Sequence, residues 1–266
     1  MEFAKSKRTV IIGCCKNNIE FIHKVFENIK QIGNLFLQYH IIILENDSSD
    51  GTREFLDSYE GSNLTVVHPP DVPDAGHSSD RLSYIRQIGV EYIRDKFSEY
   101  DFVLPMDMDR VCSDYVDIKG MITCFQYDSW AFMTPLMCPY YDLFALRAEG
   151  LYRGNMFDLA GHLDIMDSEI LFKNHKKFLC DKWNNESPFQ VHSAFCGMAI
   201  YPLDVYIKCV YKADNEHCGF EWKDCWYYTD CEHVSFNRDA REISGHPGYI
   251  NPLWRPTHDD GTEGGE

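Results

Sequence analysis

Short apolar runs alternate with helical patterns over the first hundred residues, and this alternation limits the fold more than any other feature. Runs typical of strands buried on both faces occupy residues 9–14, 40–44, 64–67 and 100–106. Amphipathic spacing between them predicts helices, the longest over residues 79–97. This order, with right-handed crossovers, predicts an α/β fold whose doubly wound, mostly parallel central sheet is flanked by helices.

Polar residues stand where each of these strands is expected to end. Asn17, Glu45 and His68 follow the first three apolar runs. The fourth run leads into Asp107 and Asp109, whose side chains point the same way on an extended backbone. Because ligands bind beyond the carboxyl ends of the strands in such sheets, this placement predicts a ligand site along one edge.

Asp107 and Asp109 indicate a metal site at that edge. Two like charges at the rim of a core repel each other, and burial adds to the cost. Mg2+ and Mn2+ prefer carboxylate oxygens, and Mg2+ often combines one or two carboxylates with phosphate oxygens of a substrate. The pair therefore predicts an enzyme that handles a diphosphate. A solvated turn is the alternative for an isolated Asp-x-Asp in an acidic chain.

The charge balance excludes some partners. Among 266 residues, 42 are acidic and 25 are basic, which gives a net charge of −17. Nucleic acids and anionic membranes require a basic surface, so we expect neither as a partner. The sequence shows no signal peptide and no transmembrane segment, and we expect a soluble, cytoplasmic protein. Its 11 cysteines are then expected to be reduced thiols.

Four elements follow one another between residues 8 and 110. The opening strand is followed by the turn Glu45–Thr52, of sequence ENDSSDGT, by Arg86-Gln87-Ile88-Gly89 on the long helix, and by Asp107-Met108-Asp109. Together they resemble glycosyltransferases of the GT-A fold, which use nucleotide-sugar donors and carry Arg-Asn-x-Gly and DxD motifs. The turn is also similar to that of fungal capsule-type α-mannosyltransferases and of similar enzymes of large DNA viruses. Gln87 departs from the usual Asn.

The resemblance implies a metal-dependent transferase that moves a hexose from a UDP- or GDP-linked donor to a hydroxyl of a glycan or glycoprotein acceptor. It implies a single GT-A catalytic domain over residues 1–258, with a nucleotide-binding half over 1–110 and a sugar and acceptor half over 111–258. Residues 259–266 are expected to form a disordered tail. A virus-encoded enzyme that acts in a host cytoplasm is consistent with this likeness.

The family pattern also implies donor-site residues in the first half. Glu45, with Asp47 in the same turn, would face the base or the ribose, and Arg86 would lie near the base or the diphosphate. Arg81 is a further candidate, although it lies five residues before Arg86 and does not share its helical face. Each has a plainer explanation, since Glu45 could cap a turn and either arginine could pair with a surface carboxylate.

For the metal, the resemblance implies that Asp109 ligates Mn2+ or Mg2+. Asp107 would contact the ribose, or reach the metal through water. His233 is the candidate third ligand, a role that a C-terminal histidine fills in many relatives, and imidazole suits Mn2+. Asp142 and Arg147 follow a fifth expected strand over residues 129–134, in a region that often shapes the donor sugar pocket.

Inverting transfer also requires a carboxylate that takes the proton of the acceptor hydroxyl. Glu232 is the candidate base, with Asp230 second, in the segment Thr229–His233 that follows the DxD at the spacing common in inverting enzymes of this fold. An acidic surface loop is the alternative. A retaining mechanism would need no such base, because the donor phosphate could take the proton, and both outcomes stay open.

Three other interpretations remain. A nucleotidyltransferase of sugar phosphates also joins a doubly wound sheet to paired carboxylates, but the loop after the first strand holds only Gly13 where such enzymes are rich in glycine. A non-catalytic sugar-binding module of the same fold is the second. A structural zinc is the third, although the spacing of its candidate ligands matches no familiar module. Those ligands are His217, Cys218, Cys225, Cys231 and His233.

Overall fold

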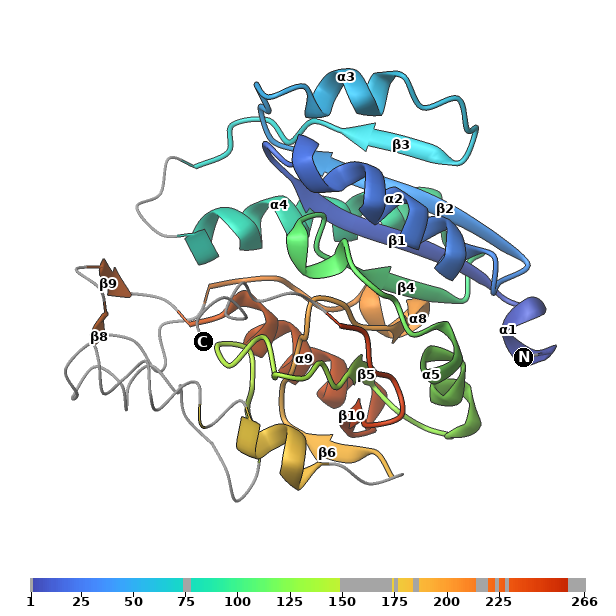
Figure 1. The fold of residues 1–266 in the computed structure, drawn as a ribbon, viewed down its shortest axis with the longest axis vertical. Helices are drawn as coiled ribbons and strands as arrows, with labels where there is room; N and C mark the ends of the chain where they lie inside the picture. The colour runs from blue at the N-terminus through green and yellow to red at the C-terminus, as the bar shows by residue number, and fades with distance from the viewer. Residues whose placement is uncertain are drawn as a thin grey trace, which may run out of the picture.

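The computed structural model describes residues 2–73, 78–148, 174, 177–183, 187–213, 220–222, 225–227 and 230–257. A five-stranded sheet in the order β3-β2-β1-β4-β7 forms its upper part (Figure 1). Its first four strands are parallel and the fifth is antiparallel to β4. The strands are β1 (Arg8–Cys15), β2 (Gln38–Glu45), β3 (Leu64–Val67), β4 (Phe102–Pro105) and β7 (Tyr201–Pro202).

Helices cover this sheet on both faces, as the right-handed crossover rule requires for connections that run in opposite directions along the sheet. Helix α2 (Ile19–Gly33) connects β1 to β2, and α4 (Ser78–Lys96) crosses from β3 to β4 (Figure 1). The other named helical elements are shorter, and α9 is the longest of them. They are α1 (Glu2–Lys5), α3 (Thr52–Asp57), η1 (Arg110–Cys112), α5 (Ile118–Thr123), η2 (Cys124–Gln126), α8 (Leu203–Tyr206) and α9 (Glu232–Ser244).

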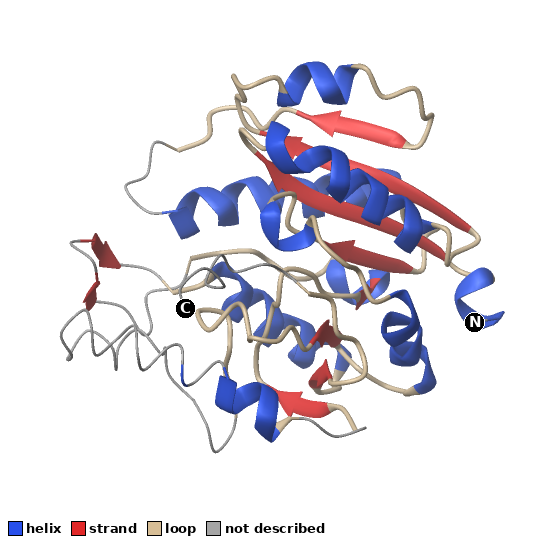
Figure 2. Cartoon of the chain, in the orientation of Figure 1, coloured by secondary structure: helices blue, strands red, loops and turns tan. Residues whose placement is uncertain are grey.

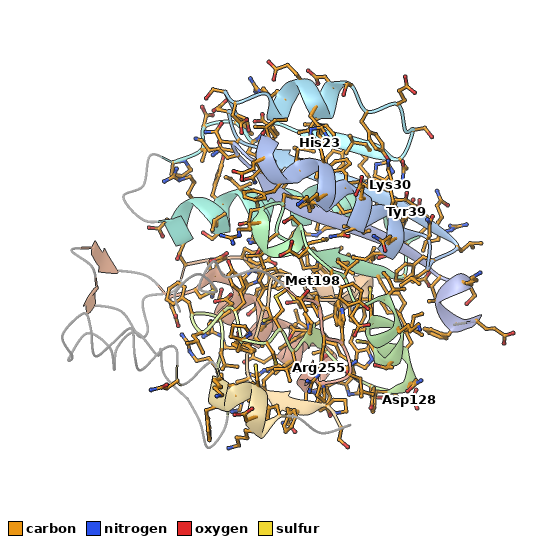
Figure 3. All side chains as sticks on the ribbon, viewed as in Figure 1. His23, Lys30, Tyr39, Asp128, Met198 and Arg255 are labelled. Carbon is orange, nitrogen blue, oxygen red and sulfur yellow. The ribbon has the colours of Figure 1, made fainter. Side chains whose placement is uncertain are left out.

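A smaller sheet continues the structure below the first. Its order is β5-β10-β6, with β5 (Phe132–Pro135) parallel to β10 (Gly248–Asn251) and β6 (Phe189–Val191) antiparallel to it. The bridge Met133–Ile200 connects the two sheets, and the bridge Met106–Met198 extends the pairing between β4 and the segment before β7. Met198 lies between the upper and lower parts of the molecule (Figure 3). A hairpin of β8 (Phe220–Trp222) and β9 (Cys225–Tyr227) completes the described strands.

The predicted strands and the long helix of the first half are confirmed, with bounds that differ by one or two residues. The second half contains more loop (Figure 2). Residues 193–201, which have the pattern of a strand, form only isolated bridges before β7. The sequence of residues 142–147 suits either a strand or the start of a helix. In the structure these residues form a turn that ends in a bridge between Arg147 and Ser193.

One hydrophobic cluster spans both halves of the described chain. It contains Ile11 and Ile42 of the large sheet, Phe132 of the small sheet and Phe236 of α9, all fully buried. The two halves therefore pack as one body around the β4–β7–β5 junction. None of the helices in the described ranges is both long and apolar enough to span a bilayer.

Gly89 allows α4 to lie close against the sheet. A Cβ atom at position 89 would lie 2.6 Å from Ile12 Cδ1 and 2.9 Å from Leu44 Cδ1, at the carboxyl-end half of β1 and β2. The same residue ends the Arg86–Gly89 motif, so the motif places its arginine at the edge of the sheet by bringing the helix close.

We expect Gly89→Val to destabilise the fold by about 1–3 kcal/mol, because the added methyl groups overpack this contact. Glu91→Val, at an exposed position two residues along the same helix, is the matched control, and it should cost clearly less. Urea denaturation followed by far-UV circular dichroism measures both. Equal losses in the two variants would show that helix propensity, rather than close packing, selects glycine here.

Candidate active site

A cavity of about 280 Å³ opens at the carboxyl ends of β1 and β4, between α4 and α9. Residues from both halves of the chain meet there. The charged and polar ones that line it are Cys14, Asn18, Ser79, Arg86, Asp107, Asp109, Tyr141, Asp142, Cys231, Glu232 and His233. It therefore lies at the edge that the sequence predicts, and it contains the predicted Asp107, Asp109, Arg86, Glu232 and His233.

Arg86 lies at the centre of this lining. It is buried, its Nε donates to Glu232 Oε1 at 3.2 Å, and one terminal nitrogen donates to Asp107 Oδ1 at 3.4 Å. The rings of Phe195 and Tyr211 lie 5.4 and 5.9 Å from its guanidinium carbon. This one side chain thus compensates carboxylates from β4 and α9 and also packs on aromatic faces, which holds it in place.

Gln87, the departure from the family pattern, has a structural task. Its Oε1 accepts a hydrogen bond from the backbone N–H of Tyr211 at 3.0 Å, and its Nε2 donates to Glu91 at 3.1 Å. The longer glutamine side chain therefore ties the Tyr211 segment to α4. Tyr211 in turn lies against Arg86, so Gln87 supports the site indirectly.

Asp107 and Asp109 occupy different environments. The Asp107 backbone N–H donates to the Gly197 carbonyl at 2.8 Å, and burial followed by the charge of Asp109 raises the pKa of its carboxyl to about 8, which Arg86 partly offsets. Asp109 Oδ1 accepts from the Val111 N–H at 3.0 Å and so caps η1. Without a cation in the cavity, Asp107 holds a proton at neutral pH, which is the cost expected for two adjacent carboxylates.

His233 is fully enclosed and lacks hydrogen-bond partners on both ring nitrogens within the described part of the chain. Its ring stacks on Phe195 with a centroid distance of 3.8 Å and an interplanar angle of 11°. Burial, with Arg86 nearby, holds the pKa of His233 well below its ordinary value. A neutral imidazole with an unused lone pair is the form in which histidine ligates a metal.

These residues suit a divalent cation. Two carboxylates and a neutral imidazole are ligands for Mn2+, and carboxylates suit Mg2+. The unpartnered nitrogens of His233 and the raised pKa of Asp107 mark groups that a cation would satisfy. In the described ranges, no three His, Cys, Asp or Glu side chains are already close enough together to hold a metal ion. The ligands are therefore gathered in one lining but not preassembled.

Glu232 and Asp230, the two candidate bases, differ in what they contact. Glu232 lies in the first turn of α9 and lines the cavity. Asp230 lies behind the lining, where it forms a buried ion pair with Arg147 and accepts the Cys231 N–H at 2.8 Å. Arg147 also donates to the carbonyls of Phe144 and Leu146. Asp230 and Arg147 thus anchor the start of α9 to the turn that carries Asp142.

The Glu45–Thr52 turn forms a clamp at the ends of β1 and β2. Glu45 is buried, and its carboxylate accepts from the Ser48 N–H at 2.6 Å and from Arg53 Nε at 2.8 Å, with His68 Nδ1 at 3.0 Å. Burial alone would raise the pKa of Glu45, but the hydrogen bonds from Ser48 and Arg53 outweigh it and lower the pKa. Glu45 is absent from the cavity lining, and the structure assigns its oxygens to the turn.

The other two donor-site candidates also lie away from the lining. Asp47 is exposed and lies 3.6 Å from Arg53, at a left-handed φ of 54°. Arg81 is half-buried, and its Nε has no hydrogen-bond partner among the described residues. Their predicted contacts with a donor stay predictions.

Phe195, Cys14, Ser79 and Tyr141 line the cavity without having been predicted. Each reaches it through tertiary packing, and a lone aromatic or small polar residue gives no sequence signal of that. Asp142, placed by the sequence near a sugar pocket, does line the cavity. Its Oδ1 accepts from the N–H groups of Phe144 and Ala145, both at 3.0 Å, and burial raises its pKa to about 6.

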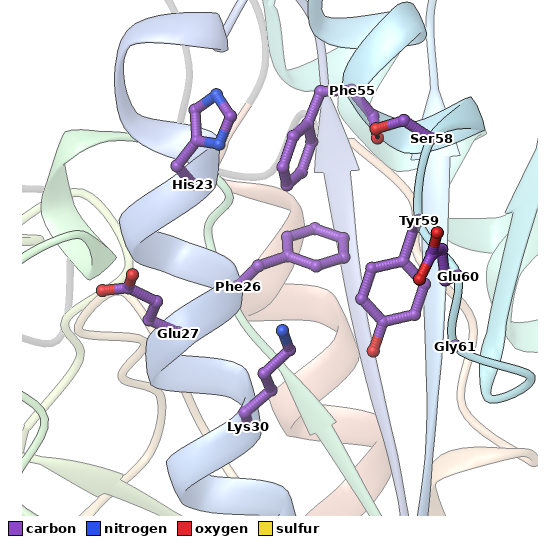
Figure 4. A pocket seen from close by; sticks show the side chains of 9 residues that line it. All are labelled: His23, Phe26, Glu27, Lys30, Phe55, Ser58, Tyr59, Glu60 and Gly61. Carbon is purple, nitrogen blue, oxygen red and sulfur yellow. Dashed lines mark hydrogen bonds between the residues drawn. The ribbon is translucent and has the colours of Figure 1, made fainter.

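Two larger cavities, each of about 520 Å³, have a different character. One lies between α2 and α3 and is lined by Phe26, Phe55 and Tyr59 with His23 and Lys30 at its rim (Figure 4). The other lies near α1, over Phe102, Phe125 and Trp130. Neither contains a pair of aspartates beside an arginine, so chemistry rather than size selects the smaller cavity as the candidate site.

No protein-family model matches the chain, and no curated protein matches it in sequence. Solved structures are similar in fold. TarS from S. aureus aligns with a TM-score of 0.50 at 12% identity, over 94% of this chain and 36% of that one. The mannosyltransferase PcManGT from Pyrobaculum calidifontis, with GDP-Man and Mn2+, gives 0.48 at 10% identity, over 97% and 59%. Glucosyl-3-phosphoglycerate synthase from Mycobacterium tuberculosis, with Mn2+, UDP and phosphoglyceric acid, gives 0.49 at 14%, over 97% and 73%.

The predicted fold class is confirmed, because the chain has the α/β architecture with a mostly parallel central sheet, flanked by helices, that characterises GT-A structures. At these identities the likeness concerns the fold alone. The chain spans 60% of the TarS 1–349 structure.

Several sequence predictions fall outside the described residues. The zinc hypothesis depends on His217 and Cys218, which lie there, and on the side chain of Cys225, which is also not described. The tail 259–266 lies outside as well.

Asp142 provides a test of the electrostatics. Its folded-state pKa is raised from 3.8 to about 6, so the folded state binds the proton more tightly than the unfolded state. The contribution of protonated Asp142 to the stability of the fold is fully present at low pH. It is lost as the pH rises from the lower to the higher of these two pKa values. We expect Asp142→Asn, which keeps the Oδ1 acceptor, to remove that loss and to gain roughly 3 kcal/mol over the wild type at pH 7.

Guanidinium denaturation at several pH values between 4 and 7 measures the difference between the two proteins. Asp204→Asn, at an exposed position of α8, is the control and should follow the wild type. A wild-type curve parallel to that of Asp142→Asn over this range would contradict the raised pKa.

Proposed function

We propose that this chain is a metal-dependent glycosyltransferase that takes a sugar from a nucleotide diphosphate. The observation that carries the proposal is the convergence of Asp107, Asp109, Arg86, Glu232 and His233 on one cavity at the carboxyl edge of the sheet. Both buried nitrogens of His233 lack a hydrogen-bond partner among the residues that the structure describes. A nucleotidyltransferase or a sugar-binding module would use the same edge, and the experiments below distinguish them by turnover.

Asp107, Asp109 and His233 would hold the cation, Mn2+ or Mg2+. When bound, such an ion neutralises a diphosphate and stabilises the leaving nucleotide. Asp109 keeps one oxygen on the Val111 N–H, which orients its carboxylate. The Mn2+, UDP and GDP-mannose bound by two of the structural neighbours belong to the ligand class proposed here.

Arg86 would supply positive charge from the chain itself. Its guanidinium is held by Glu232, Asp107 and two aromatic rings, so it requires little reorganisation when an anion arrives. Ser79, near the N-terminus of α4, lines the same wall. The donor phosphates would thus lie between α4 and the Asp107–Asp109 edge, with the sugar toward Asp142.

Glu232 would take the acceptor proton if transfer inverts the anomeric centre. It lies on the cavity wall at the start of α9, where the helix dipole favours its charge. Asp230 is a weaker candidate, because its carboxylate is committed to Arg147.

The finer parts of the proposal rest on the sequence resemblance. They are a UDP- or GDP-linked hexose such as mannose as the donor, a glycan or glycoprotein as the acceptor, a kinship with fungal or viral enzymes and a cytoplasmic site of action.

The donor and the metal can be tested together by thermal shift with UDP, GDP and their sugars, with and without Mn2+. We expect a nucleotide to raise the melting temperature only in the presence of Mn2+, by an amount equivalent to about 2.7 kcal/mol at 100-fold excess over Kd. Asp109→Asn should lose this dependence on Mn2+ while it keeps its fold, because asparagine can still cap η1.

Asp128→Asn, at an exposed position far from the cavity, controls for a general effect of removing a carboxylate. A full Mn2+-dependent shift in Asp109→Asn would remove this residue from the metal site. Hydrolysis of the nucleotide sugar under the same conditions separates an enzyme from a binding module, which would show the shift without turnover.

Substitutions of the two candidate bases are expected to affect kcat differently. Glu232→Gln retains an acceptor for Arg86 but cannot take a proton, so kcat for nucleotide-sugar hydrolysis should fall about 10²–10⁴-fold. Asp230→Asn leaves Arg147 buried without its counter-charge and should cost about 3–5 kcal/mol of stability. Its kcat, measured well below its melting temperature, should be close to that of the wild type. Unchanged turnover in Glu232→Gln would favour a retaining mechanism.

A further inference from the structure

Two thiols meet behind the cavity, on segments that are distant in sequence. Cys138 is exposed in the loop between β5 and the cavity residue Tyr141. Cys180 is half-buried in the helical residues 177–182, and its Sγ lies 3.4 Å from the carbonyl oxygen of Met137, the neighbour of Cys138. Met137 directly precedes Cys138, so the Cys180 sulfur lies beside the backbone that carries Cys138. The two thiols are therefore neighbours in the fold.

Packing on either side of this pair keeps the two segments together. Tyr140 and Trp183 are buried and meet edge to face, with ring centroids 6.0 Å apart. Leu179, next to Cys180, is fully buried. These rings and the Cys180–Met137 contact hold the loop against the helix, so the two thiols stay close to each other in the folded protein.

The electrostatic surroundings distinguish Cys138 from the other described cysteines. The hydrogen bond from Cys180 lowers the pKa of the Cys138 thiol, Arg255 lowers it further, and partial burial opposes both. Burial instead raises the pKa of Cys14 to about 11 and that of Cys196 to about 12. Since the thiolate is the reactive form, an accessible thiol of lowered pKa beside a second thiol is the arrangement of a reactive cysteine with its resolving partner.

We propose that Cys138 and Cys180 form a disulfide when the protein meets a peroxide. The Cys138 thiolate attacks one oxygen of hydrogen peroxide, the O–O bond breaks, and the hydroxide that leaves takes a proton to become water. The sulfur of Cys180, after losing its proton, then attacks the resulting sulfenic acid; the S–O bond breaks and a second water leaves. Two thiols lose two electrons in total, and the peroxide gains them.

The bond would join the loop that leads into Tyr141 and Asp142 to the helical residues 177–182. It closes a covalent ring over the chain between residues 138 and 180, which restricts the unfolded state and stabilises the folded one. The cavity lining on this side would then be held by a covalent tie in oxidising conditions and by packing alone in reducing ones.

Peptide mapping after peroxide treatment tests the assignment. The full chain is treated with a small excess of hydrogen peroxide, alkylated with iodoacetamide, digested and analysed by mass spectrometry. We expect a crosslinked peptide pair that contains Cys138 and Cys180, about 2 Da lighter than the two reduced peptides, and reversal by dithiothreitol. The pair should be absent in Cys138→Ser and Cys180→Ser, and present in Cys14→Ser.

Thermal unfolding adds a second measurement. The oxidised wild type should melt several degrees above the reduced protein, and the two serine variants should show no such difference between their treated and untreated forms. The proposal is overturned if both thiols remain open to alkylation, if Cys138 pairs with a different cysteine, or if it passes to the sulfinic acid without a crosslink. Neither the peptide mapping nor the thermal unfolding depends on transferase activity.

Discussion

The ion pair between Arg86 and Glu232 is the interaction on which the candidate site depends. It connects α4, in the first half, to α9, in the second, with Asp107 of the β4 edge as a further partner. Breaking a buried pair leaves an uncompensated charge, which costs more than the pair itself contributes. The guanidinium therefore couples the geometry of the cavity to the packing of the two halves.

Aromatic residues complete this coupling. Phe195 contacts Arg86 and stacks on the ring of His233, and Tyr211 contacts both Arg86 and His233. Tyr211 is held to α4 by Gln87. The ring of His233 is thus oriented by stacking rather than by hydrogen bonds, which leaves both of its nitrogens available. A histidine fixed by a hydrogen bond to one nitrogen would offer only the other.

Much of the first half could be predicted from sequence because its signals are local. The strands are continuous apolar runs, α2 has a clear amphipathic pattern, and parallel connectivity alone brings the strand ends, and hence Asp107 and Asp109, to one edge. Local signals are insufficient where contacts are distant. Asn17 with Glu20 has the spacing of a capping box, yet the first N–H of α2, on Ile19, is bonded by Asp50 from the next loop at 2.9 Å.

The same limit explains the second half. Asp230 and Glu232 are two residues apart and equally acidic in sequence, but one faces Arg147 inside the protein and the other faces the cavity. Which of them is available for chemistry is decided by Arg147, 83 residues away along the chain. Phe195 likewise lies between two long-range bridges, that of Ser193 with Arg147 and that of Met198 with Met106. No short segment of the sequence contains both partners of these contacts.

The charge of the lining provides an argument for a cation that is independent of any resemblance. Asp107, Asp109, Asp142 and Glu232 face the cavity, and Arg86 is the one lysine or arginine among the lining residues that the structure describes. Burial raises the pKa of Asp107 to about 8 and of Asp142 to about 6, so the chain reduces its excess negative charge by binding protons. A diphosphate entering this cavity would add negative charge to it, and one guanidinium already shared by two carboxylates does not offset that. Asp107 and His233 would hold a divalent ion, whose positive charge would offset the negative charge of the phosphates where the proposed function places them.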